Sequence, residues 1–465
     1  MSLLIVLAAL AFLMIAAYRG ASVILFAPLA ALGAVLLTDP ALVAPMFTGV
    51  FMEKMAGFLK LYFPVFLLGA VFGKAIELSG FSKSIVAGLI GVVGRERAIL
   101  SIVVVAALLT YGGVSLFVVV FAVYPFAAEM FRQSAIPKRL IPGTIALGAF
   151  SFTMDALPGT PQIQNIIPTT FFGTNIYAAP WLGTIGGVFI GVAGAAYLEW
   201  RRRCALKAGE GYGDQLLNEP EAFTGDRLVH PLVAVVPLLL VAGVNKWFTV
   251  IIPQHYGTSH SFTPVSAGKA APVVQEISKI AAVWAVEGAL LLGILSVFAL
   301  AWKPLIARFT DGSKSAIAGA LLASMNTASE YGFGGVIAAL PGFLVAADKL
   351  KAIHHPLLNE AVTVTSLAGI TGSASGGLSL ALGALSETFV QNAQAAHIPM
   401  EVLHRVAAMA SGGMDTLPHN GAVITLLAVT GLTHRAAYRD VFAITMIKTL
   451  GVLVVITVHS LTGLV

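Results

Sequence analysis

Two aspartates occupy the same short motif in distant parts of an otherwise apolar chain. The motif reads MDALP at residues 154–158 and MDTLP at residues 414–418. A proline this close to each aspartate interrupts an α-helix, because its nitrogen has no hydrogen to donate and its ring clashes with the preceding turn. Burial of a carboxylate away from water favours the protonated form. The motif therefore predicts that Asp155 and Asp415 lie beside two helix breaks and carry protons.

A second repeated motif, rich in glycine and serine, precedes each aspartate. It reads GGVSL at residues 112–116 and GGLSL at residues 376–380. Because glycine permits a tight turn, each copy is expected at the tip of a re-entrant hairpin, near residues 111–116 and 371–380. An alternative interpretation is close packing of small residues between membrane helices.

The breaks and hairpin tips supply polar groups for a ligand. Half-helix N-termini expose amides and the positive end of the helix dipole, which favours an anion. The candidate substrate-binding residues in the first half are Gly112, Gly113, Ser115, Thr160, Gln162, Gln164 and Asn165. Those in the second half are Ser373, Ser375, Gly377, Ser379, His419 and Asn420.

These residues must be positioned by membrane helices. The chain of 465 residues is 58% hydrophobic and 11% charged, with a mean hydropathy of +0.90. Globular domains carry about 25% charged residues, so the composition excludes an ordinary soluble fold. A spanning helix needs about 20 predominantly apolar residues, and apolar runs recur along the whole chain. We expect an all-α polytopic membrane protein with roughly eleven to fourteen embedded segments.

The order of the repeated motifs indicates an internal duplication. An Ile-Pro pair lies between the glycine motif and the aspartate motif in both halves, at residues 136–137 and 398–399. Such repeats are typical of secondary transporters, in which polar or proline-interrupted segments at matching positions form the substrate site. The sequence predicts a first membrane repeat at 1–200 with a broken helix near 155–165, a cytoplasmic connector at 201–228, and a second repeat at 229–465 with a broken helix near 415–422.

Other charged residues in apolar surroundings are also candidates, because ionisable groups within membrane spans are usually functional. Glu330, in the polar stretch NTASEYGFGG, is predicted to be a further proton-coupling residue. Glu287 and Glu360 are similar isolated carboxylates. For Arg405 and Lys448 the sequence leaves two places open, inside the core or at helix ends; in the second case backbone amides and neutral side chains would bind the anion.

Several function classes receive no support from the sequence. The single cysteine and the scattered histidines form no metal-binding pattern, and no cofactor is expected. The net charge of +5 is attributed to membrane orientation and not to nucleic acid. No GxxxxGK[ST] motif supports an ATP-driven pump.

The glycine-serine motifs followed by the LPGTP and LPHNG breaks, duplicated across the whole chain, resemble the gluconate permease (GntP) family of the ion transporter superfamily. The resemblance implies inverted repeats, a scaffold domain that forms a homodimer, and a mobile, elevator-type transport domain. It also implies uptake of a small organic acid, such as a sugar acid or 3-hydroxybutyrate, with protons, in the bacterial inner membrane. The MDALPGTPQ sequence departs from the His-rich first break of the gluconate permeases that the chain resembles, which indicates a divergent branch, and a shorter acid fits at least as well as gluconate.

Three alternatives to proton symport remain at this stage. A sodium-coupled carboxylate or citrate-type transporter would use carbonyl and hydroxyl oxygens, which TGSASGG at residues 371–377 could supply. An intramembrane enzyme would use Asp155 and Asp415 as an acid pair. A passive channel would use the same broken helices without coupling.

Overall fold

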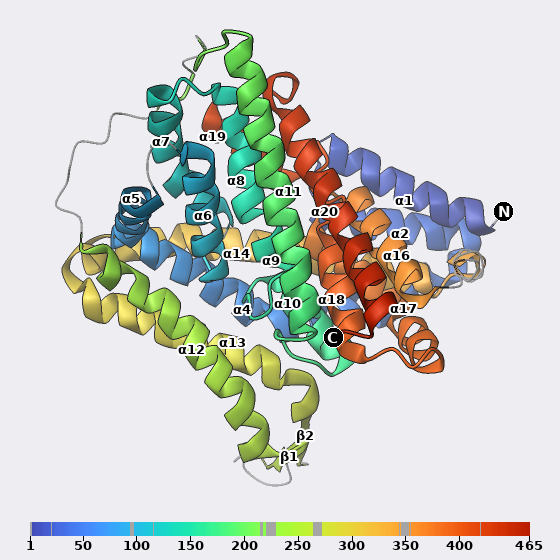
Figure 1. Ribbon diagram of the computed structural model, residues 1–465. Coiled ribbons are helices and arrows are strands. Elements are labelled where there is room, and N and C mark those ends of the chain that lie inside the picture. Colours follow the sequence, from blue (N-terminus) through green and yellow to red (C-terminus); the bar gives the residue numbers. More distant parts are fainter. Residues whose placement is uncertain are drawn as a thin grey trace.

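The architecture is that of a helical bundle, described from a computed structural model (Figure 1). The described residues are 2–19, 21–93, 97–114, 116–213, 217–219, 229–263, 272–343, 345, 353, 355–418 and 420–465.

The first half of the chain contains both long helices and short helical pieces separated by glycine and proline. They are α1 (Ser2–Tyr18), α2 (Val23–Thr38), η1 (Pro40–Leu42), α3 (Val43–Met46), the π-helix η2 (Phe47–Met52), α4 (Glu53–Leu78), α5 (Phe81–Val93), α6 (Ala98–Tyr111), α7 (Leu116–Gln133), η4 (Lys138–Leu140), α8 (Ile141–Ala149), α9 (Phe152–Asp155), α10 (Ile163–Phe172) and α11 (Pro180–Lys207).

The second half has a similar mixture. It contains α12 (Pro231–Tyr256), β1 (Ser259–Phe262), β2 (Val273–Glu276), α13 (Ile277–Leu300), α14 (Trp302–Ala338), α16 (Pro356–Thr371), α17 (Ala374–Ala395), α18 (Met400–Ser411), α19 (Gly421–Thr430) and α20 (His434–Thr462).

Two layers of long helices enclose the short ones. α4 packs along α14, and α12 pairs with α13 beside them (Figure 1). α11 packs along α20 through the middle of the molecule, with α8 and α18 beside this pair. The short helices α9, α10 and α18 contact one another, so the interrupted segments of the two halves meet inside the bundle.

Five helical segments among the described residues are long and apolar enough to cross a membrane. They are Pro40–Leu78, Pro180–Lys207, Pro231–Tyr256, Lys279–Leu300 and His434–Thr462. The larger number of embedded segments expected from the sequence includes shorter, interrupted ones and stays a prediction. The expectation of an all-helical chain needs one addition, because β1 and β2 form an exposed antiparallel pair at the outer end of α12 and α13.

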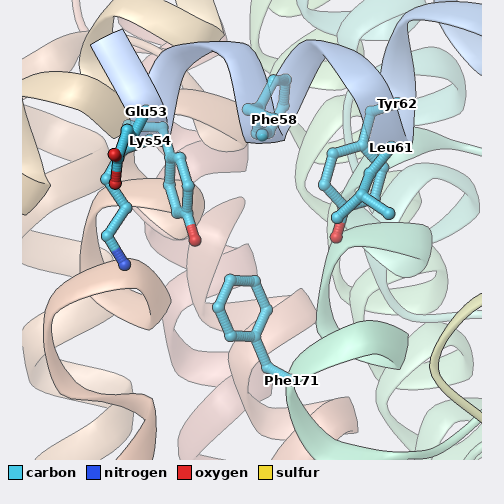
Figure 2. Close-up of a pocket in the computed structure, with 8 residues that line it drawn as sticks. Glu53, Lys54, Phe58, Leu61, Tyr62 and Phe171 are labelled. Atoms are coloured by element: carbon cyan, nitrogen blue, oxygen red, sulfur yellow. The ribbon is translucent and has the colours of Figure 1, made fainter. Parts of the chain in front are cut away.

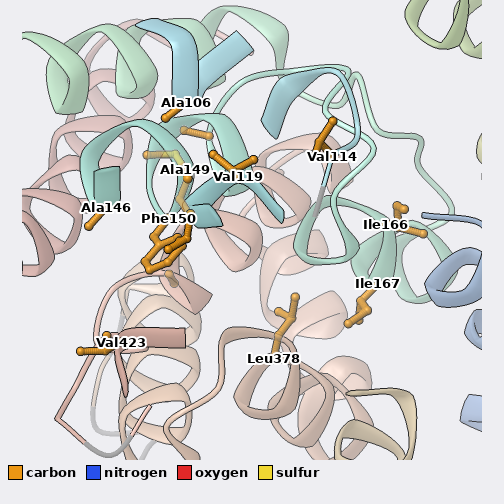
Figure 3. Close-up of a cluster of buried hydrophobic side chains, with 14 of the residues drawn as sticks. Ala106, Val114, Val119, Ala146, Ala149, Phe150, Ile166, Ile167, Leu378 and Val423 are labelled. Carbon is orange, nitrogen blue, oxygen red and sulfur yellow. The ribbon is translucent and has the colours of Figure 1, made fainter. Parts of the chain in front are cut away.

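The core is a continuous set of apolar side chains that joins both halves. Figure 3 shows Val119 of α7, Ala149 of α8, Ile166 of α10, Leu378 of α17 and Val423 of α19 within it. All five are completely buried. The broken helices are therefore held by packing on several sides, which fixes the polar groups that they carry.

Candidate functional site

The first aspartate motif lies between two short helices. α9 ends at Asp155 and α10 begins at Ile163, and the intervening residues are not helical. This segment contains Pro158 and Pro161, neither of which can donate a backbone hydrogen bond. Gly159 between them has φ +84°, in the left-handed region that glycine adopts without strain.

The second aspartate motif has the same kind of surroundings. α18 ends at Ser411 and α19 begins at Gly421, with Asp415 and Pro418 in the non-helical segment between them. The side chains of Asp155 and Asp415 are buried, with exposed fractions of 1% and 4%. Two carboxylates thus lie deep in the molecule at interruptions of the backbone.

Lys448 of α20 brings the two aspartates together. Its Nζ lies 3.0 Å from Oδ1 of Asp415 and 3.8 Å from Oδ2 of Asp155. The same ammonium donates a hydrogen bond of 2.5 Å to the carbonyl oxygen of Phe150. An ammonium between two carboxylates lowers their mutual repulsion, so this arrangement lets both approach one point in the core.

Arg405 of α18 is another buried cation, and it binds backbone carbonyls. Its Nε and Nη2 donate to the carbonyl oxygen of Ala178 at 3.1 and 2.8 Å. Its Nη1 donates to the carbonyl oxygen of Asp155 at 3.2 Å. The guanidinium therefore holds the end of α9 and the loop after α10 in fixed positions relative to α18.

Of the two places that the sequence left open for Arg405 and Lys448, the structure shows the core and not the helix ends. Both side chains are fully buried, with exposed fractions of 0% and 2%. The sequence did contain a signal for Lys448, because it interrupts a long apolar helix and a charged residue in such a place is usually functional. Arg405 has no such signal, since it lies in a short helix beside two other polar residues, Glu401 and His404.

Both the nitrogen and the oxygen of the Asn165 side-chain amide are hydrogen-bonded within the protein. Its Nδ2 donates to the carbonyl oxygens of Thr160 and Ile176 at 3.0 and 2.8 Å. Its Oδ1 lies 3.0 Å from Nη1 of Arg405 and 3.1 Å from Nε2 of His404. This side chain thus organises the first break, and its predicted contact with a substrate would require breaking one of these bonds.

Side-chain amides tie each hairpin tip to its neighbouring break. Gln162 donates a hydrogen bond of 2.7 Å to the carbonyl oxygen of Thr110 at the end of α6. Asn420 donates one of 2.7 Å to the carbonyl oxygen of Gly372, between α16 and α17. The hydroxyl of Tyr111 adds a bond of 2.8 Å to the carbonyl oxygen of Pro158.

The glycine motifs take different positions in the two hairpins. Gly112 and Gly113 follow α6 directly, and Gly113 has φ +90° in the turn. In the second hairpin the turn consists of Gly372 and Ser373, whereas Gly377 lies inside α17. A Cβ at Gly377 would be 2.2 Å from Cα of Ala368, so this glycine permits close packing of α16 against α17.

The helix N-termini near the breaks differ in their capping. Ser373 caps α17 through the amide of Gly376, and Asn420 caps α19 through the amide of Val423. The first turn of α10 has no side-chain cap. Beside it, Oγ1 of Thr160 and Oε1 of Gln164 are buried and make no hydrogen bond with any described residue. The amide of Asn165 in this turn donates to the carbonyl oxygen of Gln162 at 2.9 Å. The N-terminus of α10 is therefore a place where an anion would meet amides without a side-chain cap.

Glu330 of α14 lies against the second hairpin. A Cβ built on Gly376 would be 1.4 Å from Oε2 of Glu330, which shows that the carboxylate contacts this glycine. The side chain is 2% exposed, and Oε2 has no hydrogen-bond partner among the described residues. Nearby, the hydroxyl of Ser375 lies 3.2 Å from Oγ1 of Thr327 and 3.4 Å from Oγ of Ser373.

Three of the predicted substrate-binding residues, Ser115, Ser379 and His419, have not yet been placed in the fold. The hydroxyl of Ser379 is buried in α17 without a partner among the described residues. Ser115 and His419 lie outside the described residues. Within the described part of the chain, His, Cys, Asp and Glu side chains form no group of three that could hold a metal ion.

The connector after α11 folds back onto the helices that lead to the site. Arg139 hydrogen-bonds Glu210 through two contacts of 2.7 Å, and it also approaches Asp440 at 3.3 Å. Arg201 binds the same Asp440 at 2.7 Å. The hydrogen bonds and the charge of Arg139 outweigh partial burial and hold the pKa of Glu210 below its ordinary value of 4.5.

Comparisons with known proteins agree with a transport function. No family model matches the chain. The chain is 58% identical over 474 residues to the uncharacterized transporter YxjC of Bacillus subtilis strain 168, and the match covers 100% of each chain. Its fold is similar to that of the Alcanivorax borkumensis YdaH transporter, with a TM-score of 0.51 over 92% of this chain and 90% of that one. At 14% sequence identity this second likeness concerns the fold alone.

Proposed function

The chain belongs to the transporter family that includes YxjC of Bacillus subtilis, and we propose that it takes up a small organic acid anion by proton symport. The substrate class is a hydroxy monocarboxylate, such as 3-hydroxybutyrate, or a sugar acid. The membrane is the inner membrane of a bacterium. The protein is a helical membrane transporter, and the proposal concerns its cargo and coupling ion.

The observation that carries the proposal is the shared contact of Asp155 and Asp415 with Lys448. Each aspartate lies at an interruption in its own half of the chain, and polar interruptions of this kind are where secondary transporters bind their cargo. Non-helical backbone at membrane depth needs protein or a water-filled cavity around it. Near the ammonium of Lys448, the charge of the substrate and the charge of the coupling proton would interact.

Charge balance explains why a proton would accompany the anion. Asp155 and Asp415, when ionised, are balanced by Lys448 and Arg405, whereas Glu330 is a further buried carboxylate. A carboxylate that enters this region adds a negative charge where screening by water is weak. Protonation of Asp155, Asp415 or Glu330 removes one negative charge from this region. Binding of the anion and binding of the proton would therefore favour each other.

The amides without a side-chain cap at the N-terminus of α10 are the proposed contact for the substrate carboxylate. Thr160 and Gln164 would complete this site from the first half. From the second half, the proposal uses the serines of the hairpin, Ser373, Ser375 and Ser379. This assignment is supported by the absence of a side-chain cap on α10 and by the capped state of α17 and α19.

The wider organisation is proposed from the resemblance to gluconate permeases. In this proposal two inverted repeats each supply a hairpin and a broken helix. A scaffold domain forms a homodimer, and a transport domain moves against it in an elevator mechanism. The meeting of α9, α10 and α18 inside the bundle is compatible with such a transport domain.

A sodium-coupled carboxylate transporter is the second candidate. It is favoured by the buried oxygens of Asp155 and Thr160, which have no hydrogen-bond partner among the described residues and are of the kind that hard cations bind. An acid pair for intramembrane catalysis is less well supported. In such a pair two carboxylates share a proton. Here both carboxylates instead contact the ammonium of Lys448.

Uptake by purified protein in proteoliposomes tests the proposal. We expect saturable uptake of radiolabelled 3-hydroxybutyrate under an inward proton gradient, lost in Asp155→Asn and Asp415→Asn. Asp311→Asn is the control, because that carboxylate is 90% exposed on α14. Uptake that follows sodium and ignores pH would establish the second candidate. Absence of uptake of any acid among C3 to C6 competitors would contradict both.

A further inference from the structure

A cavity that contains neither the aspartates nor the hairpin tips lies between α4, α10 and α14. It is partly open, has a volume of about 150 Å³ and is lined by Glu53, Lys54, Gly57, Phe58, Leu61, Tyr62, Phe171 and Tyr331. Figure 2 shows that the residues of α4 line one side and that Phe171 of α10 enters from the opposite side. None of these residues belongs to the site described above.

Aromatic rings form the walls of this cavity. The ring centroids of Phe58 and Phe171 lie 5.7 and 6.3 Å from that of Tyr331, and Tyr62 lies 4.7 Å from Phe58. The hydroxyl of Tyr62 is already engaged with the carbonyl oxygen of Ile167 at 3.2 Å. The walls therefore offer apolar contact and few free hydrogen-bonding groups.

Lys54 places a positive charge at the rim. Its Nζ lies 5.9 Å from the ring centroid of Tyr331. Its alkyl stem packs over Gly335 of α14, where a Cβ would be 2.7 Å from Cγ of Lys54. The glycine thus makes room for the stem, and the stem keeps the ammonium near the aromatic walls.

The helix geometry at this point is unusual. The π-helix η2 (Phe47–Met52) leads directly into Glu53 and Lys54. Such turns are rare and occur frequently at functional sites. The first turn of α4, which follows the π-helix, supplies Glu53 and Lys54 to the lining of the cavity.

From these observations we propose that the cavity binds a monocarboxylate with a compact apolar body, about the size of benzoate. An apolar protein cavity of about 150 Å³ is known to hold one benzene ring, so the ring would fill this space. Its carboxylate would pair with Lys54. A polyhydroxylated acid such as gluconate would lose hydrogen bonds to water that the walls do not replace.

Glu53 is the charged group that opposes this binding. It lines the same cavity one residue before Lys54. A carboxylate ligand is repelled by it and attracted by Lys54. Glu53→Gln is therefore expected to tighten the binding of benzoate, whereas Lys54→Met is expected to weaken it at least tenfold.

The test is equilibrium binding of radiolabelled benzoate to the full-length protein in detergent. Gly57→Leu should abolish binding by filling the space, because no atom lies within 4 Å of a Cβ at this position. The controls are Gly69→Leu and Lys60→Met, since both residues lie on α4 outside the cavity and Gly69 also has open space around its Cβ. Gluconate should not compete.

Three outcomes would overturn the inference. The first is benzoate binding that Lys54→Met and Gly57→Leu leave unchanged. The second is equal binding of neutral benzyl alcohol, which would mean that the cavity binds apolar groups without recognising a carboxylate. The third is loss of binding in Asp155→Asn, which would place benzoate in the transport site. Binding that persists in Asp155→Asn supports a separate site even if the proposed symport fails.

Discussion

The carboxylate of Asp155 lies directly against Gly412, the first residue after α18. A Cβ built at Gly412 would be 1.9 Å from Oδ2 of Asp155 and 2.9 Å from Cε of Lys448. The aspartate of the first break is thus fitted against the backbone of the second. Only a residue without a side chain leaves room for the contact between Asp155 and Lys448.

The first prediction concerns this contact. Gly412→Ala should displace the Asp155 carboxylate from Lys448 and reduce proton-driven uptake at least tenfold, because its φ of −79° permits alanine but its surroundings do not. Gly421→Ala is the matched control, since a Cβ at the start of α19 meets no atom within 4 Å. Normal uptake by Gly412→Ala would contradict the coupling of the two breaks.

The second prediction concerns charge in the core. Lys448→Met should lower the free energy of unfolding by about 3–5 kcal/mol, because removal of one partner leaves a buried charge uncompensated. Adding Asp415→Asn should restore part of this loss, since the double variant no longer carries the carboxylate that Lys448 binds at 3.0 Å. Thermal unfolding in detergent measures both. A double variant less stable than Lys448→Met would refute this account.

The third prediction distinguishes the roles of two neighbouring polar residues, Gln164 and Asn165. Asn165→Leu should reduce stability by about 1–3 kcal/mol for each partner left unsatisfied, since its amide makes four contacts. Gln164→Leu should leave stability nearly unchanged but raise KM for 3-hydroxybutyrate, because Oε1 of Gln164 has no partner among the described residues. The reverse pattern would mean that Asn165 contacts the substrate and Gln164 is structural.

The fourth prediction concerns pH and the connector. Because the pKa of Glu210 in the folded protein is below 4.5, its pairing with Arg139 is complete above that pH and is lost as the pH falls through the lowered value. A fluorophore on Cys204, the single and exposed cysteine, should therefore lose anisotropy as the pH falls below 4.5. Glu210→Gln should show low anisotropy at neutral pH. A flat profile in the original protein would show that this pair does not hold the connector.

The location of the aspartates could be predicted because it depends on local chemistry. Proline after each aspartate removes a backbone donor and disfavours a regular helix at that point, and α9 and α18 do end before the prolines of the two motifs. The partner of the aspartates could not be predicted in the same way. Lys448 is separated from Asp155 by most of the chain, and no spacing rule relates them.

The glycine motifs show another limit of sequence reasoning. GGVSL and GGLSL look equivalent, yet Gly113 lies in a turn and Gly377 lies inside a helix. Glycine is used for left-handed backbone in the first case and for close packing in the second. Which use applies depends on the neighbouring helix, which the local sequence does not contain.

The ties between hairpins and breaks have a mechanical consequence. Gln162 and Tyr111 join the first tip to the first break, and Asn420 joins the second tip to the second break. A displacement of either tip therefore breaks these hydrogen bonds unless its break moves with it. Lys448 contacts the carboxylates of both breaks, so the two tip-and-break pairs share one ammonium.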